Sequence, residues 1–321
     1  MGKFLTKRLF FVLLLSLVAL SGGCSNIPTE ANKSDDTSKV NQSDDTSKAN
    51  KSDDTSKVNQ SDDTSLEDID IKLEIGETEE RENWTQTFVY PNNIDDTFVI
   101  DVCLPDDYDE NITYPVVYLT DCYWRRDDYG SIKELYQSGK TKEFILIGIG
   151  YPEDYNFDVI RQRDLLFEPD KFLSMIVKGV IPYVENNYKI DAKDRTFCGA
   201  SFGGYFMVYS LFQSDGLTEG IFKNYVLASP TFWEVTDGIP LEEFEENYYD
   251  RTNILNANVY LTVGEDEDEV DFLRPIDEFV EEVEGRDYQG LNLTYKVYEG
   301  KHHYTVWMPS LLDGLEMYLA K

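Results

Sequence analysis

The sequence predicts an α/β fold, built as a mostly parallel sheet of eight strands with helices on both faces. Short apolar runs recur along the chain from residue 85, and segments of helical or polar character separate them. Two of these runs, 116–119 and 144–149, are continuously apolar. That pattern is typical of parallel strands whose two faces are both buried.

The expected elements follow in chain order. Residues 85–90 and 98–104 form a pair of strands, separated by the turn-rich sequence Pro91-Asn92-Asn93. The other six strands are expected at 116–119, 144–149, 196–198, 225–228, 259–263 and 293–298. Apolar residues at helical spacing predict helices around 172–180, 276–283 and 307–318. Active sites in such sheets lie outside the carboxyl ends of the strands.

The first residues have the pattern of an export signal. A positively charged start is followed by an apolar run over 9–20 and by small residues, which predicts a signal peptide over 1–23. The end of this segment resembles a bacterial lipobox, in which Cys24 would carry the lipid. The expected location is therefore the outer face of a bacterial cell membrane, with plain secretion as the alternative.

Residues 24–65 are expected to form a disordered tether. The sequence Ser-Asp-Asp-Thr-Ser recurs at residues 34, 43, 52 and 61, and each repeat holds too few apolar side chains to build a core. The tether would hold a domain off the membrane. Residues 66–321 are long enough to form one folded domain with a single core.

The charge of the chain limits its partners. The formal net charge is −33 at pH 7, most of it after residue 65. Such a field argues against binding to nucleic acid or directly to an anionic membrane surface, so contact with the membrane is expected through the lipid alone. Cys103, Cys122 and Cys198 have spacings that match no metal motif, and we expect neither a metal nor a cofactor.

The stretch 199–204, Gly-Ala-Ser-Phe-Gly-Gly, carries the strongest chemical signal. It joins an expected strand to the expected helix 205–212. A serine on such a tight turn is pushed out of the backbone, where a base can reach its hydroxyl. The pattern predicts Ser201 as a nucleophile, with the backbone N–H of Phe202 facing a developing oxyanion.

A nucleophilic serine needs a base, and the chain has only two histidines, His302 and His303. They follow the last expected strand. The base in turn needs an acid, and the acidic run 265–269 follows the strand at 259–263. The chain order is then serine, acid, histidine, which is the order of the α/β-hydrolases.

Several further segments of the chain form recognisable motifs. The first is Tyr-Pro-Val-Val-Tyr-Leu-Thr-Asp at residues 114–121. The others are Arg-Gln-Arg-Asp at 161–164, the serine stretch at 199–204, Ser-Pro-Thr-Phe-Trp at 229–233, and Glu-Gly-Lys-His at 299–302, which Trp307 follows. Together they resemble the putative-esterase family of α/β-hydrolases, which includes esterase D, enterochelin-type esterases and feruloyl esterases. The resemblance spans about residues 85–320.

The resemblance implies roles for particular residues. Its spacing selects His302 rather than His303 as the base, and it points to Glu267 as the acid, with Asp268 and Asp266 as alternatives. The second oxyanion N–H, beside that of Phe202, would be that of Tyr123.

The function that follows is that of a cell-surface serine esterase. It would hydrolyse a small carboxylic ester, such as a carbohydrate ester or a siderophore-like ester, through an acyl-enzyme. One alternative is an acyltransferase on the same scaffold. The other is a surface lipoprotein that binds a ligand without catalysis.

The stretch between Trp233 and Asn256 is rich in acids and aromatic residues. We expect an amphipathic helix there whose aromatic side chains, among them Phe244 and Tyr248, pack on the core. A cap over the active site is the alternative.

Overall fold

The structure is a computed structural model, and it describes residues 70–232 and 241–321. The described residues belong to one compact unit, Gln60–Lys321. The signal peptide, the lipidated Cys24 and the repeat tether all fall outside the described residues, and these three assignments stay predictions.

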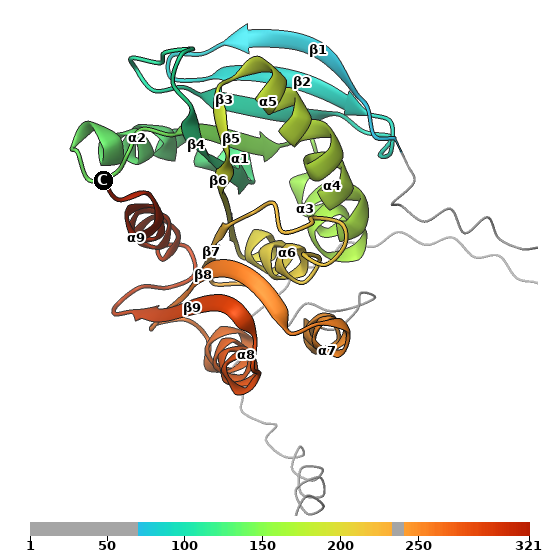
Figure 1. Ribbon diagram of the computed structural model, residues 1–321, viewed down its shortest axis with the longest axis vertical. Coiled ribbons are helices and arrows are strands. Elements are labelled where there is room, and N and C mark those ends of the chain that lie inside the picture. The colour runs from blue at the N-terminus through green and yellow to red at the C-terminus, as the bar shows by residue number, and fades with distance from the viewer. Residues whose placement is uncertain (1–69, 233–240) are drawn as a thin grey trace, which may run out of the picture. The chain divides into compact units, whose positions relative to one another are not determined.

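One sheet of nine strands organises the described residues, in the order β1-β2-β3-β5-β4-β6-β7-β8-β9 (Figure 1). The strands are β1 (Leu73–Glu80), β2 (Thr85–Pro91), β3 (Phe98–Cys103), β4 (Tyr114–Thr120), β5 (Ile145–Gly150), β6 (Ile190–Ala200), β7 (Asn224–Ala228), β8 (Ile254–Gly264) and β9 (Gln289–Tyr298). The pairs from β1 to β3, and β3 with β5, are antiparallel. The pairs from β5 through β9 are all parallel, so the prediction of a mostly parallel α/β sheet is confirmed.

The expectation of eight strands is wrong by one, because β1 was not foreseen. Its sequence, Leu-Glu-Ile-Gly-Glu-Thr-Glu-Glu, holds four glutamates and only two large apolar residues. Among the described residues, β1 lies at the edge of the sheet and pairs with β2 alone, so no described strand packs on its outer side. Charged residues are common on such edges because they discourage pairing with other chains. A search for apolar runs therefore misses this strand.

Helices connect the strands and cover both faces. They are α1 (Cys122–Arg125), α2 (Tyr129–Gln137), α3 (Phe157–Gln162), α4 (Pro169–Met175), α5 (Ile181–Asn187), α6 (Phe202–Leu211), α7 (Leu241–Arg251), α8 (Arg274–Gly285) and α9 (Trp307–Leu319). Short 3₁₀ or π turns stand at Arg126–Asp128, Arg163–Phe167, Ile176–Val180 and Glu269–Leu273. The expected helices around 172–180, 276–283 and 307–318 are confirmed.

The sheet separates two apolar cores. Val117 and Leu119 of β4 face one core, which they share with residues of α2 and α9. Val116 and Tyr118, the alternate residues of β4, face the other core, which α4, α5, α6 and α8 cover. Successive side chains of a strand point to opposite faces, so a continuously apolar strand such as β4 supplies both cores.

Helix α7 packs on the second of these cores. Phe244 and Tyr248 are both buried there. The carboxylate of Glu245, also buried, accepts hydrogen bonds from the Arg286 guanidinium at 2.7 Å and from the Tyr288 hydroxyl at 2.7 Å. The expectation of an amphipathic helix with its aromatics on the core is confirmed for the described part of this insertion. Within the described ranges, no helix has both the length and the apolar composition that a membrane span requires.

Candidate active site

Ser201 stands alone between β6 and α6, on a sharp turn. Its backbone has φ 59° and ψ −121°, a conformation that costs energy for a residue with a side chain. Backbone hydrogen bonds hold it there. The Ser201 N–H donates to the Ala228 carbonyl at 3.0 Å, and the Tyr205 N–H donates to the Ser201 carbonyl at 3.0 Å. This is the turn on which a nucleophilic serine is exposed in α/β-hydrolases.

The glycines of the serine stretch are required by close packing. A Cβ on Gly199 would lie 2.4 Å from the Gly203 carbonyl oxygen, and a Cβ on Gly203 would lie 2.6 Å from the Thr120 Oγ1. Neither position has space for a side chain. The residues around Ser201 therefore let β6, α6 and the end of β4 approach one another closely.

Glu267 follows β8, and its carboxylate is fully buried. One oxygen accepts hydrogen bonds from the Gly264 N–H at 2.7 Å and from the Ser229 hydroxyl. The other oxygen lies 3.1 Å from the Nδ1 of His303. A buried carboxylate with three polar partners has one fixed orientation, which is what a residue that orients a histidine needs.

The two alternative acids lie elsewhere. Asp268 is exposed, and its side chain caps the following turn by accepting from the N–H groups of Val270 at 2.8 Å and Asp271 at 3.0 Å. Asp266 is also exposed. Of the three candidate acids, the structure thus brings Glu267 to a histidine.

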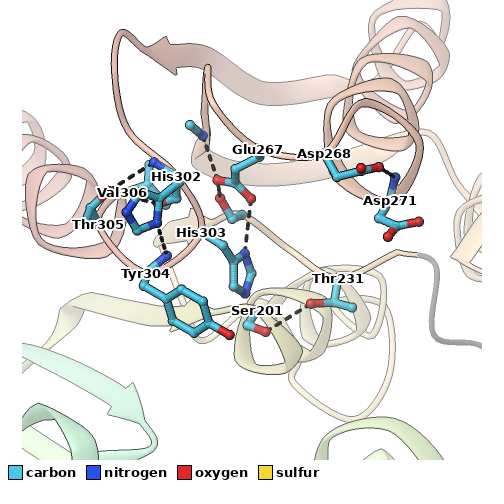
Figure 2. A network of polar contacts seen from close by, with 12 residues as sticks. Ser201, Thr231, Glu267, Asp268, Asp271, His302, His303, Tyr304, Thr305 and Val306 are labelled. Atoms are coloured by element: carbon cyan, nitrogen blue, oxygen red, sulfur yellow. Dashed lines mark hydrogen bonds and ion pairs between the residues drawn. The ribbon is translucent and has the colours of Figure 1, made fainter. Parts of the chain in front are cut away.

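That histidine is His303. Figure 2 shows its imidazole between Glu267 and Ser201, with the second ring nitrogen directed toward the serine. An ionised Glu267 carboxylate has no proton to donate in a hydrogen bond. The facing Nδ1 is therefore assigned as the protonated nitrogen, and Nε2 is left as an acceptor. The ring packs on Phe272, with centroids 4.4 Å apart.

The placement of His303 beside Glu267 differs from the expectation, which selected His302. The His302 ring turns to the other side of the loop, where its Nδ1 accepts from the Tyr304 N–H at 3.3 Å (Figure 2). The carbonyl of His302 accepts from the N–H groups of Thr305 at 2.8 Å and Val306 at 3.0 Å. These bonds tie the backbone of His302 to the start of α9. The register of the loop therefore presents the next residue, His303, to the site.

The expected oxyanion donors stand at helix starts. Phe202 is the first residue of α6 and Tyr123 is the second of α1. The first N–H groups of a helix have no acceptor within that helix, so both are free of helical bonding. Asp121, which precedes α1 with φ 63°, pairs with the Arg161 guanidinium through bonds of 2.7 and 2.8 Å. That pair, whose carboxylate is buried and whose guanidinium is partly exposed, fixes the loop that leads into α1 and Tyr123.

Aromatic and cationic side chains gather beside this loop. The rings of Tyr123 and Phe157 stack at 4.5 Å, and Trp124 lies 5.1 Å from Phe157. The Arg161 guanidinium lies over the Trp124 ring at 4.8 Å, and that of Arg125 lies over the Trp307 ring at 4.2 Å. Tyr123 and Trp124 are exposed, so they form an aromatic surface next to the expected oxyanion donors.

The three cysteines in the described ranges are free thiols inside the protein. Burial raises the pKa of each thiol, Cys103, Cys122 and Cys198, so none is a thiolate nucleophile at neutral pH. Within residues 70–232 and 241–321, no three histidine, cysteine or carboxylate side chains are grouped to hold a metal ion.

Two hydroxyl groups at the site were not foreseen in the sequence as functional. Ser229 contacts Glu267, and the Thr231 Oγ1 lies 3.0 Å from the Ser201 Oγ. The available signal was their position directly after β7, at the carboxyl edge where Ser201, Glu267 and His303 also follow their strands. Sequence alone does not show which of several polar residues in such a loop turns inward.

A comparison with family models decides the relationship. Residues 92–318 match the model of the esterase family described as Putative esterase. The chain belongs to this family. The resemblance stated from the sequence motifs is thereby confirmed at the level of the family, and membership supports an esterase.

The chain is also similar to individual proteins, in sequence to one and in fold to others. The chain is 27% identical over 145 residues to the ferri-bacillibactin esterase BesA of Bacillus subtilis, a match that covers 37% of this chain and 48% of BesA. The chain thus spans about half the length of the curated relative it matches. The BES protein of Bacillus cereus shares the fold with a TM-score of 0.65 at 24% identity, over 77% of this chain and 98% of that one. The siderophore hydrolase EstA of Aspergillus nidulans has a TM-score of 0.59 at 20% identity, over 69% and 89% of the two chains.

Proposed function

We propose that this protein is a serine esterase that hydrolyses a small carboxylic ester with Ser201, His303 and Glu267. The observation that carries the proposal is the placement of one imidazole between a fully buried carboxylate and a serine on a strained turn (Figure 2). Membership of the esterase family supports it independently.

In the proposed first step, the Ser201 Oγ attacks the ester carbonyl while its proton moves to the Nε2 of His303. The carbonyl oxygen becomes an oxyanion, which the N–H groups of Phe202 and Tyr123 stabilise. His303 then gives the proton to the leaving alcohol, and an acyl-enzyme remains. Water, deprotonated by His303, releases the acid by the same steps. Throughout, the ionised Glu267 stabilises the imidazolium that forms beside it.

For the substrate we propose an ester of the siderophore type. BesA and EstA carry this chemistry in their names, and this chain is similar to both. The aromatic rings of Tyr123 and Trp124, with the Arg161 guanidinium, offer a surface that suits planar or anionic groups beside the scissile ester. The N-terminal signal pattern and Cys24 support a location on the outer face of a bacterial cell membrane.

The test begins with the Ser201→Ala variant and a short p-nitrophenyl ester. Removal of the nucleophile should lower turnover about 10⁴-fold or more while leaving the melting temperature nearly unchanged. A fluorophosphonate probe should label the wild-type protein and not the variant. Equal turnover by the two proteins would disprove the proposal.

A panel of esters then addresses the substrate. Hydrolysis of catecholate or hydroxamate siderophore esters should exceed that of acetyl and feruloyl esters by kcat/KM. A preference for simple acetyl esters would contradict the siderophore assignment while leaving the serine mechanism intact.

A further inference from the structure

One short turn contacts both ends of the proposed triad. Ser229, Pro230 and Thr231 leave the end of β7, and the Ser229 hydroxyl donates to Glu267. Two residues later, the Thr231 N–H donates to the Ser201 carbonyl at 3.2 Å, and the Thr231 Oγ1 lies 3.0 Å from the Ser201 Oγ. The dashed line between these two hydroxyls is visible in Figure 2.

The direction of the bond between the two hydroxyls follows from the residues beyond Ser201. When the Glu267 carboxylate is ionised it only accepts, so the facing Nδ1 of His303 donates and Nε2 accepts. For Ser201 to be deprotonated by Nε2, its proton must point to His303. The Ser201 oxygen is then free to accept, and the Thr231 hydroxyl is the donor.

The surroundings of Thr231 suit this role. The residue is 1% exposed, so water does not compete for its hydroxyl. Among the described residues, the Thr231 side chain forms one hydrogen bond, with the Ser201 hydroxyl. A buried hydroxyl with a single neighbour of this kind directs its proton there, because leaving it unpaired is costly. The branched side chain also has few rotamers, which keeps the donor in place.

We propose that Thr231 donates a hydrogen bond to the Ser201 Oγ and stabilises the negative charge that this atom carries during catalysis. This inference rests on the proposed esterase function. In the first step the Ser201 proton goes to His303 and the Oγ attacks the carbonyl carbon. In the last step the bond between Oγ and the acyl carbon breaks, the electron pair returns to Oγ, and His303 returns the proton. Thr231 keeps its own proton throughout.

The bond strengthens when its acceptor is charged, and it therefore acts more on the transition states than on bound substrate. Loss of the hydroxyl should thus lower kcat and kcat/KM together and leave KM nearly constant. If the Thr231 hydroxyl had a purely structural role, its loss would not lower kcat at constant KM. Its loss would also lower the stability of the protein.

Three substitutions test the proposal. Thr231→Val keeps the shape and removes the hydroxyl, Thr231→Ala removes it with less volume, and Thr231→Ser restores it. We expect kcat for a p-nitrophenyl ester to fall about 10- to 100-fold in the first two variants, as for one hydrogen bond to a charged group. KM should stay within about twofold. The Ser variant should keep at least about one third of the wild-type kcat. The rate of labelling by a fluorophosphonate should follow the same order.

Thr196→Val is the matched control. Thr196 is a fully buried threonine of β6, and its hydroxyl accepts from the Asn224 side chain at 3.3 Å. It lies within the strand and not at the carboxyl end that leads to Ser201. The same change there should leave kcat unaltered. If the wild type is active and both the Val and Ala variants match it, the role of Thr231 is disproved and the esterase proposal stands. If the wild type neither hydrolyses esters nor labels at Ser201, both proposals fail together.

Discussion

Four non-glycine residues in the described ranges have a positive φ angle, namely Asp121, Ser201, Glu219 and Ser229. Three of them stand at the site. Asp121 precedes the Tyr123 N–H, Ser201 is the proposed nucleophile, and Ser229 holds Glu267. Backbone strain of this kind persists only where the surroundings over-determine it, and it gathers at functional sites. The distribution of strained residues thus marks the same site as the side chains do.

The two adjacent histidines provide a matched pair of variants. His303→Ala should lower kcat about 10³-fold or more, because Ser201 loses its base. His302→Ala removes an equal ring one residue away, whose contacts lie within its own loop, and should keep kcat within about threefold. Hydrolysis of a p-nitrophenyl ester measures both. If kcat falls further in the His302 variant than in the His303 variant, His302 is the base.

At the scale of elements, the site is assembled from the ends of neighbouring parallel strands. β6 leads to Ser201, β8 leads to Glu267 and β9 leads to His303. The loops are also joined to each other, since the Asp266 N–H donates to the Lys301 carbonyl at 2.9 Å. At Gly264 the same carbonyl oxygen would lie 2.3 Å from a Cβ, so only glycine lets the acid and histidine loops come this close.

The pair between Asp121 and Arg161 links α1 to α3, and its loss should be felt in both stability and activity. Arg161→Met leaves the nearly buried Asp121 carboxylate without its partner, which should lower the free energy of unfolding by about 3–5 kcal/mol. It should also lower kcat, because the start of α1, which holds the Tyr123 N–H, loosens. Urea denaturation and ester hydrolysis measure the two effects. Adding Asp121→Asn to the Arg161→Met variant should recover part of the stability. No recovery would mean that Arg161 acts by packing rather than through its charge.

At the scale of the whole molecule, the formal net charge of −33 opposes compaction. Salt screens such repulsion, with a Debye length of about 10 Å at 0.1 M. The melting temperature should therefore rise between low and moderate ionic strength, as measured by a dye-based or calorimetric scan. Sodium and potassium chloride should act alike, since screening depends on ionic strength. A fall in melting temperature with salt would show that ion pairs outweigh the repulsion.

The sequence predicted most of this architecture because its main signals are local. Buried parallel strands such as β4 and β5 are continuous apolar runs. The turn at Ser201 requires glycines, because a side chain at either position would clash with its neighbours. These constraints are visible in a few consecutive residues. Glu267 was expected as the acid only through the family resemblance, since the residues alone left Asp266 and Asp268 open.

The features that the sequence could not show depend on contacts between residues that are far apart along the chain. Which of His302 and His303 lies beside Glu267 is set by how their loop bonds to the start of α9 and to the loop after β8. β1 carries no apolar run, because an edge strand is held by one neighbour and by its backbone. The inward turn of Thr231 needs the Ser201 carbonyl as a backbone partner, which is distant along the chain.

The position of β1 has a mechanical consequence. The described chain enters the sheet through this strand, and β2, β3, β5 and β4 stand between it and the serine-bearing β6. Tension applied at the amino-terminal end of the domain is first borne by the hydrogen bonds between β1 and β2. Those bonds can separate while β6 to β9 keep their pairing and the catalytic geometry with it. Separation of this edge strand would therefore leave the strands that lead to the site paired with one another.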